Sequence, residues 1–398
     1  MNLEDELSET FQERIVRTDY PSTSMATIVG RAHAVRRRRR RTTAIVAAAA
    51  AAAFAIPAAG LWAQHAHRSV PEPASSPWRG IEEGPAPGVD YLRGSEYHQA
   101  GSSVFRLPLS TVTAAAVYRR GWLVAYTTAQ DDRRLSWLDD QLRTRWTTCA
   151  GPGPSIVRSA DGIRVAYATV GCRDGVTTLH LGPAEALMGE EQTERLRGQH
   201  DVRLAGIVGD GVVYSHPSAD GTGRTVVTDL QGRDRRLRGL GPAVSTDPSG
   251  RLVAGRRGAQ GTTVVDQRSG STLWSTPEAC CAFSFDGSYA LTLEPTGPSG
   301  VVARELRVLD TADGRQTATI TLPPRLYVQG VTWDLDDTVL VSVTDVDPGA
   351  PPAAGDSVRA IHQAILRFDL SGGAPTLAAP MVRVDQEADG YAFPAPGT

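Results

Sequence analysis

The chain has 398 residues, of which 41% are hydrophobic, so it is long enough for one large all-β domain or two ordinary domains. All 41 basic residues are arginine and Asn2 is the one asparagine, a bias typical of a GC-rich coding sequence such as an actinobacterial one. The formal net charge of −3 is uneven, because residues 1–41 carry nine arginines and six acidic residues while the remainder carries −6. This acidic bulk argues against nucleic acid as a ligand, since phosphate binding needs concentrated positive charge.

Residues 1–41 predict an amphipathic, arginine-rich segment with short helices. Near the N-terminus, apolar side chains recur four apart on one face of a helix: Leu3, Leu7, Phe11 and Ile15. A helix this short is marginal alone in water, so its apolar stripe needs a surface to pack on. That surface could belong to a cytoplasmic partner; otherwise the segment lies on the membrane or stays loose, and both interpretations stay open.

Residues 42–63 predict a transmembrane helix. From Thr42 to Ala63 there is no charged residue. At 1.5 Å per residue this segment spans roughly 33 Å, enough for the ~30 Å hydrocarbon core. Arg36–Arg41 directly precede it, so the positive-inside rule predicts a single-pass membrane protein with a cytoplasmic N-terminus and an extracytoplasmic C-terminal part. A cleaved signal peptide is the alternative, although its n-region would be unusually long.

Residues 64–87 are rich in proline, glycine and serine and predict an extended linker. From residue 88 to 398, short apolar runs alternate with turn sequences. The strand-like runs include GWLVAYTT (121–128), RVAYATV (164–170), RLVAG (251–255), YALTLE (289–294) and TVLVSVTD (338–345). Each follows a tight turn such as SADG (159–162) or SFDG (284–287), where an Asp-Gly pair allows a positive φ. A second polar turn follows each pair of strands, which predicts four-stranded antiparallel units.

The first turns recur near residues 120, 161, 210, 249, 286 and 336, at a mean spacing of about 43 residues. Four-stranded units at this period resemble the blades of WD40-like or TolB-like β-propellers. This resemblance implies an all-β propeller. Six units are marked by turns, and three short strands in 89–110 with one in 390–395 would close a seventh blade shared by both ends. We therefore expect seven blades, with six or eight as alternatives.

Four cysteines are present: Cys149, Cys172, Cys280 and Cys281. An extracytoplasmic location permits disulfides. In the blade that the resemblance implies, Cys149 would lie in the linker that enters the innermost strand and Cys172 just after the second strand, on the same face. We therefore predict a Cys149–Cys172 bond. A bond between Cys280 and Cys281 stays open, with two free thiols as the alternative.

No enzyme motif is evident: the sequence lacks G-x-S-x-G, a P-loop and H-E-x-x-H. It also lacks the cysteine and histidine spacing of a zinc site, so we expect no catalytic residue, metal or cofactor. Acid pairs such as Asp139-Asp140 occupy expected turns. The loop with Asp345, Asp347 and Asp356 could touch a cation but lacks the spacing of a calcium loop.

The layout predicts a membrane-anchored propeller that binds an unidentified extracytoplasmic protein or ligand. It resembles actinobacterial single-pass proteins whose short cytoplasmic segment is suspected of restraining a sigma factor, which implies a cytoplasmic regulatory partner for residues 1–41. One alternative is a secreted or surface scaffold without signalling. Another is a propeller enzyme that acts on envelope sugars.

Overall fold

A computed structural model describes most of the chain after residue 76. The described ranges are 77–100, 103–109, 111–151, 155–184, 191–196, 201–216, 223–257, 261–293, 305–334, 337–346, 360–384 and 390–393. The chain divides into two compact units, Met1–Pro73 and Ala74–Thr398, and every described residue belongs to the second. The expected N-terminal helices and the span at 42–63 lie outside these ranges.

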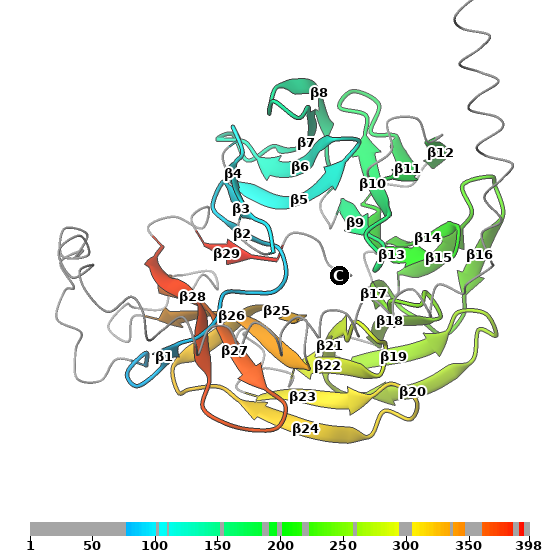
Figure 1. Ribbon diagram of the computed structural model, residues 1–398. Helices are drawn as coiled ribbons and strands as arrows, with labels where there is room; N and C mark the ends of the chain where they lie inside the picture. Colours follow the sequence, from blue (N-terminus) through cyan, green and yellow to red (C-terminus); the bar gives the residue numbers. More distant parts are fainter. Residues whose placement is uncertain are drawn as a thin grey trace, which may run out of the picture. The chain divides into compact units, whose positions relative to one another are not determined.

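The described part is all-β, and its sheets are arranged around a common centre like the blades of a propeller (Figure 1). Its regular elements are the strands β1 to β29, and it includes no helix long and apolar enough to cross a bilayer. The expected all-β propeller is therefore confirmed.

Three sheets each consist of four consecutive antiparallel strands. The first contains β13 (Arg203–Val208), β14 (Gly211–His216), β15 (Arg224–Thr228) and β16 (Asp234–Leu237). The second contains β17 (Ala243–Thr246), β18 (Leu252–Arg257), β19 (Gly261–Asp266) and β20 (Thr272–Thr276). The third contains β21 (Ala279–Phe283), β22 (Tyr289–Leu293), β23 (Glu305–Asp310) and β24 (Gln316–Thr321).

A larger sheet contains eight strands in two antiparallel runs of four. The first run is β5 (Val112–Tyr118), β6 (Gly121–Thr127), β7 (Arg133–Leu138) and β8 (Thr144–Cys149). The second is β9 (Ile156–Arg158), β10 (Arg164–Val170), β11 (Thr177–Pro183) and β12 (Gln192–Leu196). The runs meet where Cys149 of β8 pairs with Val170 of β10. The expectation of seven blades, with six or eight as alternatives, is corrected here, because this pairing leaves six hydrogen-bonded sheets in the described part.

The sheet at the seam of the ring combines both ends of the described chain. Its order is β29 (Tyr391–Ala392), β2 (Tyr91–Arg93), β3 (Glu96–His98) and β4 (Val104–Arg106). Leu92 pairs with Ala392 and Arg93 with Tyr391. The predicted closing sheet, with three strands from one end and one from the other, is confirmed.

The neighbouring sheet contains β25 (Leu326–Trp333), β26 (Thr338–Val346), β27 (Ala360–Asp369) and β28 (Thr376–Arg383). A fifth strand, β1 (Glu82–Glu83), is added in parallel to the outer edge of β28. The expected linker at 64–87 therefore differs from the structure from residue 77 onward. Backbone pairing and a buried tryptophan hold these residues on the sheet, although their composition is typical of a linker.

The inner strands β6, β10 and β14 are buried on both faces. Successive side chains in a strand point to opposite faces, yet Leu123 and Val124 of β6 are both fully buried. Leu123 packs with Val165 and Tyr167 of the next run, whereas Val124 packs with Leu92 of the closing sheet. The core thus lies in layers between neighbouring sheets.

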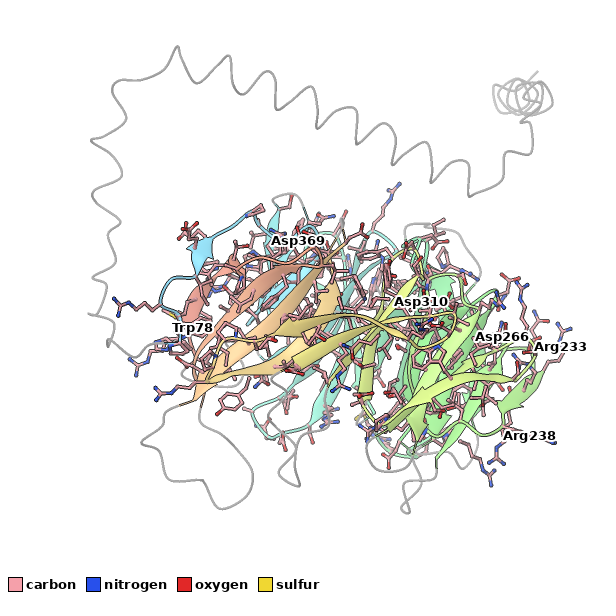
Figure 2. All side chains as sticks on the ribbon, turned by 90° about the horizontal axis from the view of Figure 1, so that it is seen from below. Trp78, Arg233, Arg238, Asp266, Asp310 and Asp369 are labelled. Carbon is pink, nitrogen blue, oxygen red and sulfur yellow. A yellow bond between two sulfur atoms is a disulfide. The ribbon has the colours of Figure 1, made fainter. Side chains whose placement is uncertain are left out.

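Aspartates organise both kinds of turn. In the S-x-D-G turns, Ser159 Oγ donates to Asp161 Oδ1 at 2.6 Å and Ser284 Oγ donates to Asp286 Oδ1 at 2.7 Å. In the outer turns, an aspartate that ends a strand or directly follows it accepts hydrogen bonds from backbone amides two to four residues later in the chain. Five aspartates do this, and Figure 2 labels three of them: Asp139, Asp229, Asp266, Asp310 and Asp369. These carboxylates cap turns, as expected for Asx-turns.

Closure of the ring can be tested at Tyr391. Its side chain is 4% exposed, and its hydroxyl donates to the Pro380 carbonyl at 2.8 Å. The substitution Tyr391→Ala should lower the free energy of unfolding by about 3 kcal/mol, measured by urea denaturation of the full chain. Val104→Ala, at a side chain 54% exposed on β4, is the control and should change it by less than about 0.5 kcal/mol. Equal stability of the two variants would contradict closure by β29.

Candidate binding cleft

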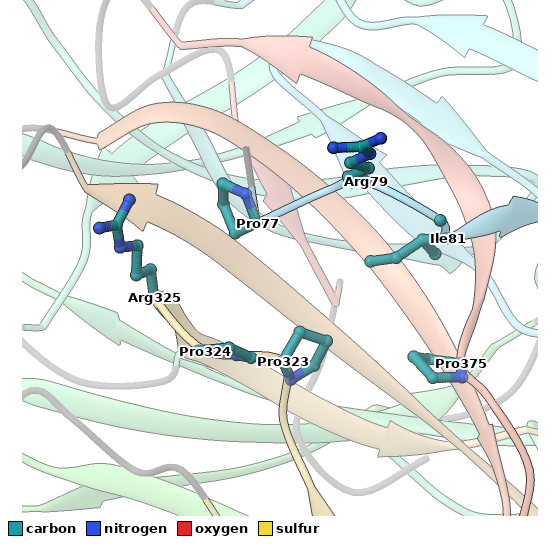
Figure 3. Close-up of a pocket in the computed structure, with 8 residues that line it drawn as sticks. Pro77, Arg79, Ile81, Pro323, Pro324, Arg325 and Pro375 are labelled. Atoms are coloured by element: carbon teal, nitrogen blue, oxygen red, sulfur yellow. The ribbon is translucent and has the colours of Figure 1, made fainter. Parts of the chain in front are cut away.

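A cleft of about 400 Å³ lies where the chain enters the five-stranded sheet. One wall comes from the start of the segment 77–88, which we call the N-terminal strap. The opposite wall comes from the connection between β24 and β25, and Pro375 lies just before β28. The lining residues are Pro77, Arg79, Gly80, Ile81, Pro323, Pro324, Arg325 and Pro375 (Figure 3).

Trp78 holds the strap wall of the cleft in place. Its side chain is 7% exposed and packs with Leu322, Leu326 and Phe368. Its indole Nε1 donates to Asp345 Oδ2 at 2.8 Å. With the ring buried, its neighbours Pro77 and Arg79 are held at the cleft.

Asp345 accepts the hydrogen bond that holds the Trp78 indole. Besides the indole, it accepts from the His362 backbone amide at 2.7 Å, and His362 Nδ1 lies 2.9 Å from its Oδ2. These contacts satisfy the buried carboxylate. Asp347 and Asp356, which the sequence grouped with Asp345 as cation contacts, lie outside the described residues. Within the described ranges, no three His, Cys, Asp or Glu side chains are grouped to hold a metal.

The rest of the strap is tied to the same sheet by its backbone. The Gly84 amide donates to the Leu377 carbonyl at 2.8 Å, and the Gly88 amide donates to Asp334 Oδ1 at 2.9 Å. Gly84 passes so close to Thr376 that a Cβ at this position would collide with the threonine side chain. Glycine is therefore required for this close approach.

Arg367 clamps the end of the strap. Its guanidinium donates to the Pro85 carbonyl at 2.5 Å and to the Ala86 carbonyl at 3.0 Å, while Nε donates to Asp334 Oδ2 at 2.8 Å. The side chains of Arg367 and Asp334 are 13% and 6% exposed, so this ion pair is largely screened from water. Hydrogen bonds between charged groups in such surroundings are stronger than hydrogen bonds between neutral groups.

The lining of the cleft combines apolar rings with two cations. Four prolines and Ile81 supply apolar surface, and the exposed side chains of Arg79 and Arg325 supply positive charge. Arg325 has a φ of 69°, in the left-handed region that costs a non-glycine residue about 1 kcal/mol or more. The Leu326 amide donates to the Pro323 carbonyl at 3.3 Å, so Arg325 is the third residue of a tight turn that holds this conformation.

A smaller depression of about 190 Å³ lies over three hairpin turns, those after β9, β13 and β17. Its charged side chains already have partners. Arg164 Nη1 lies 3.2 Å from Asp210, and Asp161 and Asp247 accept bonds within their own turns. We therefore assign this depression to turn structure.

A polar cluster joins the two runs of the eight-stranded sheet. Glu191 Oε1 accepts from the Tyr167 hydroxyl at 2.5 Å and lies 2.7 Å from His180 Nδ1. The Tyr167 and His180 rings stack at 4.3 Å, and Arg119 lies 3.3 Å from Glu191 Oε2. Burial acts to raise the pKa of Glu191, but hydrogen bonds from His180 and Tyr167 and the charge of Arg119 outweigh it and lower this pKa. The cluster stabilises the packing between the runs.

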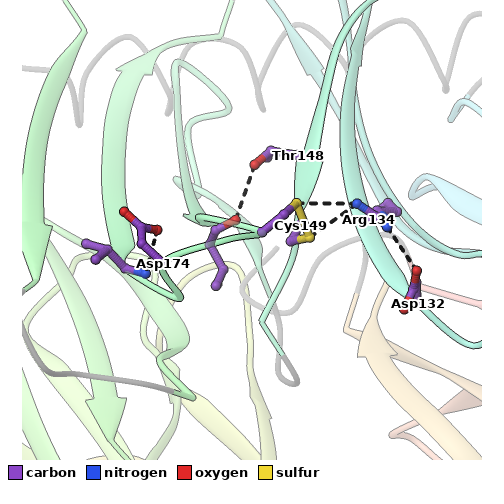
Figure 4. The surroundings of a disulfide bond; sticks show 8 residues. Asp132, Arg134, Thr148, Cys149 and Asp174 are labelled. Atoms are coloured by element: carbon purple, nitrogen blue, oxygen red, sulfur yellow. Dashed lines mark hydrogen bonds and ion pairs between the residues drawn. A yellow bond between two sulfur atoms is a disulfide. The ribbon is translucent and has the colours of Figure 1, made fainter.

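The structure contains the disulfide predicted between Cys149 and Cys172, with Cα atoms 5.2 Å apart (Figure 4). Arg134 Nη1 lies 3.2 Å and 3.3 Å from the two sulfurs, and its Nη2 donates to Asp132 at 2.9 Å. The expected position of Cys149 is corrected, because it ends the outer strand β8 instead of lying in a linker. The bond therefore joins the two runs and reinforces their pairing at Val170.

Several residues singled out in the sequence lie outside what the structure describes. These are Leu3, Leu7, Phe11 and Ile15, together with the side chains of Cys280 and Cys281, whose backbone forms part of β21. The cleft itself was missed by the sequence analysis. A signal was present, because a tryptophan at position 78 is an unusual residue for a solvated linker.

Neither the protein-family models nor the curated proteins contain a match to this chain. Among solved structures, a chain of a mitotic checkpoint complex is similar, with 13% identity and a TM-score of 0.45 over 83% of this chain and 91% of that one. The β-propeller domain of Cps50 (Swd1) from Myceliophteria thermophila has 11% identity and a TM-score of 0.44 over 69% of this chain and 88% of that one. At these identities the similarity concerns the fold alone.

The Glu191 cluster predicts a pH dependence. A carboxylate whose pKa is lower in the folded chain stabilises it above the unfolded value near 4.5, and this contribution is lost as the pH falls through the folded pKa. Glu191→Gln should therefore cost about 1–3 kcal/mol at pH 7 and less at pH 3. Urea denaturation across this range measures the difference, with Glu83→Gln, at an exposed side chain, as the control. A stability difference between Glu191→Gln and the unsubstituted chain that does not change with pH would contradict the assigned role.

Proposed function

We propose that this chain is a binding protein, a β-propeller scaffold that presents the cleft to a protein partner. The cleft carries the proposal: it is an apolar cavity with exposed arginines at its edge, built from segments far apart in the sequence. Its described lining contains no carboxylate, histidine, cysteine or hydroxyl. It therefore suits binding better than acid–base or nucleophilic catalysis.

In this proposal the propeller is held outside the cell by residues 42–63. The uncharged 22-residue run and the six preceding arginines support this topology. Residues 1–41 then form a cytoplasmic arm whose apolar stripe of Leu3, Leu7, Phe11 and Ile15 packs on a regulatory protein in an anti-sigma-like manner. The acidic remainder of the chain supports a partner other than nucleic acid.

The proposal also treats the eight-stranded sheet as two repeat units. Its runs β5–β8 and β9–β12 each have the four-strand order of the other sheets and join at one residue pair. Counted in this way the ring has seven units. The disulfide beside that pair would then lock two neighbouring blades together.

Site-specific photocrosslinking in the producing cells tests the proposed partner. A benzoylphenylalanine residue would replace Ile81 or Pro375 in the cleft, and Val104 or Leu273, both exposed on other sheets, in the controls. We expect a cross-linked species of higher mass from the cleft positions and none from the controls. The same species from all four positions, or none from the cleft, would contradict the proposed site.

The same cells test the topology with a tag at the C-terminus. Protease added to intact cells should remove the tag while the rest of the chain stays in the membrane fraction. A shorter tagged chain in the medium would instead support the secreted-scaffold alternative. That result would be compatible with the proposed binding function, but it would contradict the proposed cytoplasmic arm.

A further inference from the structure

The chemistry of the cleft narrows the kind of partner segment that it can hold, provided that the proposed function is correct. Four of its lining residues are prolines, whose rings offer flat apolar surface and no backbone N–H. In Figure 3 the rings of Pro323 and Pro324 lie opposite Pro77, with Ile81 and Pro375 at one end. A flat, rigid side chain fills such a space with little loss of conformational entropy, and aromatic side chains have this shape.

Arg79 and Arg325 favour certain chemical groups in the partner segment, beside its aromatic ring. A guanidinium stacks on aromatic faces and also binds a carboxylate through two parallel hydrogen bonds. Arg79 belongs to the strap and Arg325 to the opposite wall, so both walls offer this group.

Two carboxylates limit how acidic the occupant can be. Glu82 and Glu83 of β1 follow Ile81 directly, and both are exposed. They would repel a uniformly acidic chain at the Ile81 end of the cleft. A carboxylate of the partner is therefore favoured on the Arg325 side of the cleft, which lies away from Ile81 in Figure 3, and disfavoured at the Ile81 end.

We infer that the cleft binds a segment of a partner protein that carries an aromatic side chain beside a carboxylate. A sugar fits less well, because the described lining has no aromatic ring to stack on a pyranose and few hydrogen-bonding groups. A nucleotide combines an aromatic ring with an anion, but the net charge of −6 after residue 41 disfavours a nucleic acid.

Fluorescence anisotropy of the purified full chain with a labelled peptide tests this inference. The probe is a nine-residue peptide with a central tryptophan flanked by two glutamates on each side. We expect saturable binding below about 1 mM, weakened at least about tenfold when alanine replaces the tryptophan or glutamine replaces the glutamates. The double variant Arg79→Ala/Arg325→Ala should weaken binding by a similar factor.

Arg238→Ala is the matched control, because Arg238 is an exposed arginine just after β16, at the outer edge of another sheet (Figure 2). It should leave the affinity unchanged. An equal loss in the control and the double variant would overturn the inference, as would undiminished binding of the alanine peptide. Tighter binding of single-stranded oligothymidine that displaces the probe would also overturn it, in favour of a nucleic acid.

Failure of this inference can be told apart from failure of the proposed function. If the cleft positions cross-link to a cellular protein but the peptide does not bind, the chain has a partner of different chemistry. If the peptide does not bind and the cleft positions do not cross-link, both proposals fail. Circular dichroism of each variant should match the unsubstituted chain, since Arg79 and Arg325 are exposed and their removal leaves the core intact.

Discussion

The structure depends on closure of the ring by the two ends of its folded part. β29 pairs with β2, while β1 lies on the outer edge of β28, so the N-terminal strap crosses from one sheet to the next. An open ring would expose backbone donors and acceptors on both terminal strands. The strap covers a different edge, the outer edge of β28, before the chain enters the closing sheet. The cleft lies at the five-stranded sheet, where the first residues of the strap form one of its walls.

Buried hydrogen bonds hold the docked strap on the five-stranded sheet. Asp345 accepts the Trp78 indole, and Asp334 accepts both the Gly88 amide and Arg367. Removing the strap would deprive two buried carboxylates of donors, which costs more than the loss of an exposed contact. A ligand that binds both walls of the cleft would therefore stabilise the docked strap, and docking would raise the affinity for that ligand by the same factor.

Much of the ring could be predicted because its turns have local signatures. The serine and aspartate of SADG and SFDG bond to each other within their turns, so these short sequences specify a hairpin without help from the rest of the fold. The closing strand at 391–392 could be predicted because three strand-like runs at the start of the propeller and one at its end were left without a complete four-stranded unit. The joining of β8 to β10 could not be predicted, because it rests on one residue pair. The cleft was missed because β1 is too short to show alternation and because its two walls are more than two hundred residues apart in the chain.

Hydrogen exchange of the native full chain, followed by mass spectrometry, tests the docked strap most directly. The peptide of interest covers residues 77–91, where the Gly84 and Gly88 amides donate to Leu377 and Asp334. Docking as described predicts that these two amides exchange slowly, with protection close to that of the buried strand β26. Exchange at the rate of a solvated linker would contradict a docked strap and, with it, a cleft built from two walls.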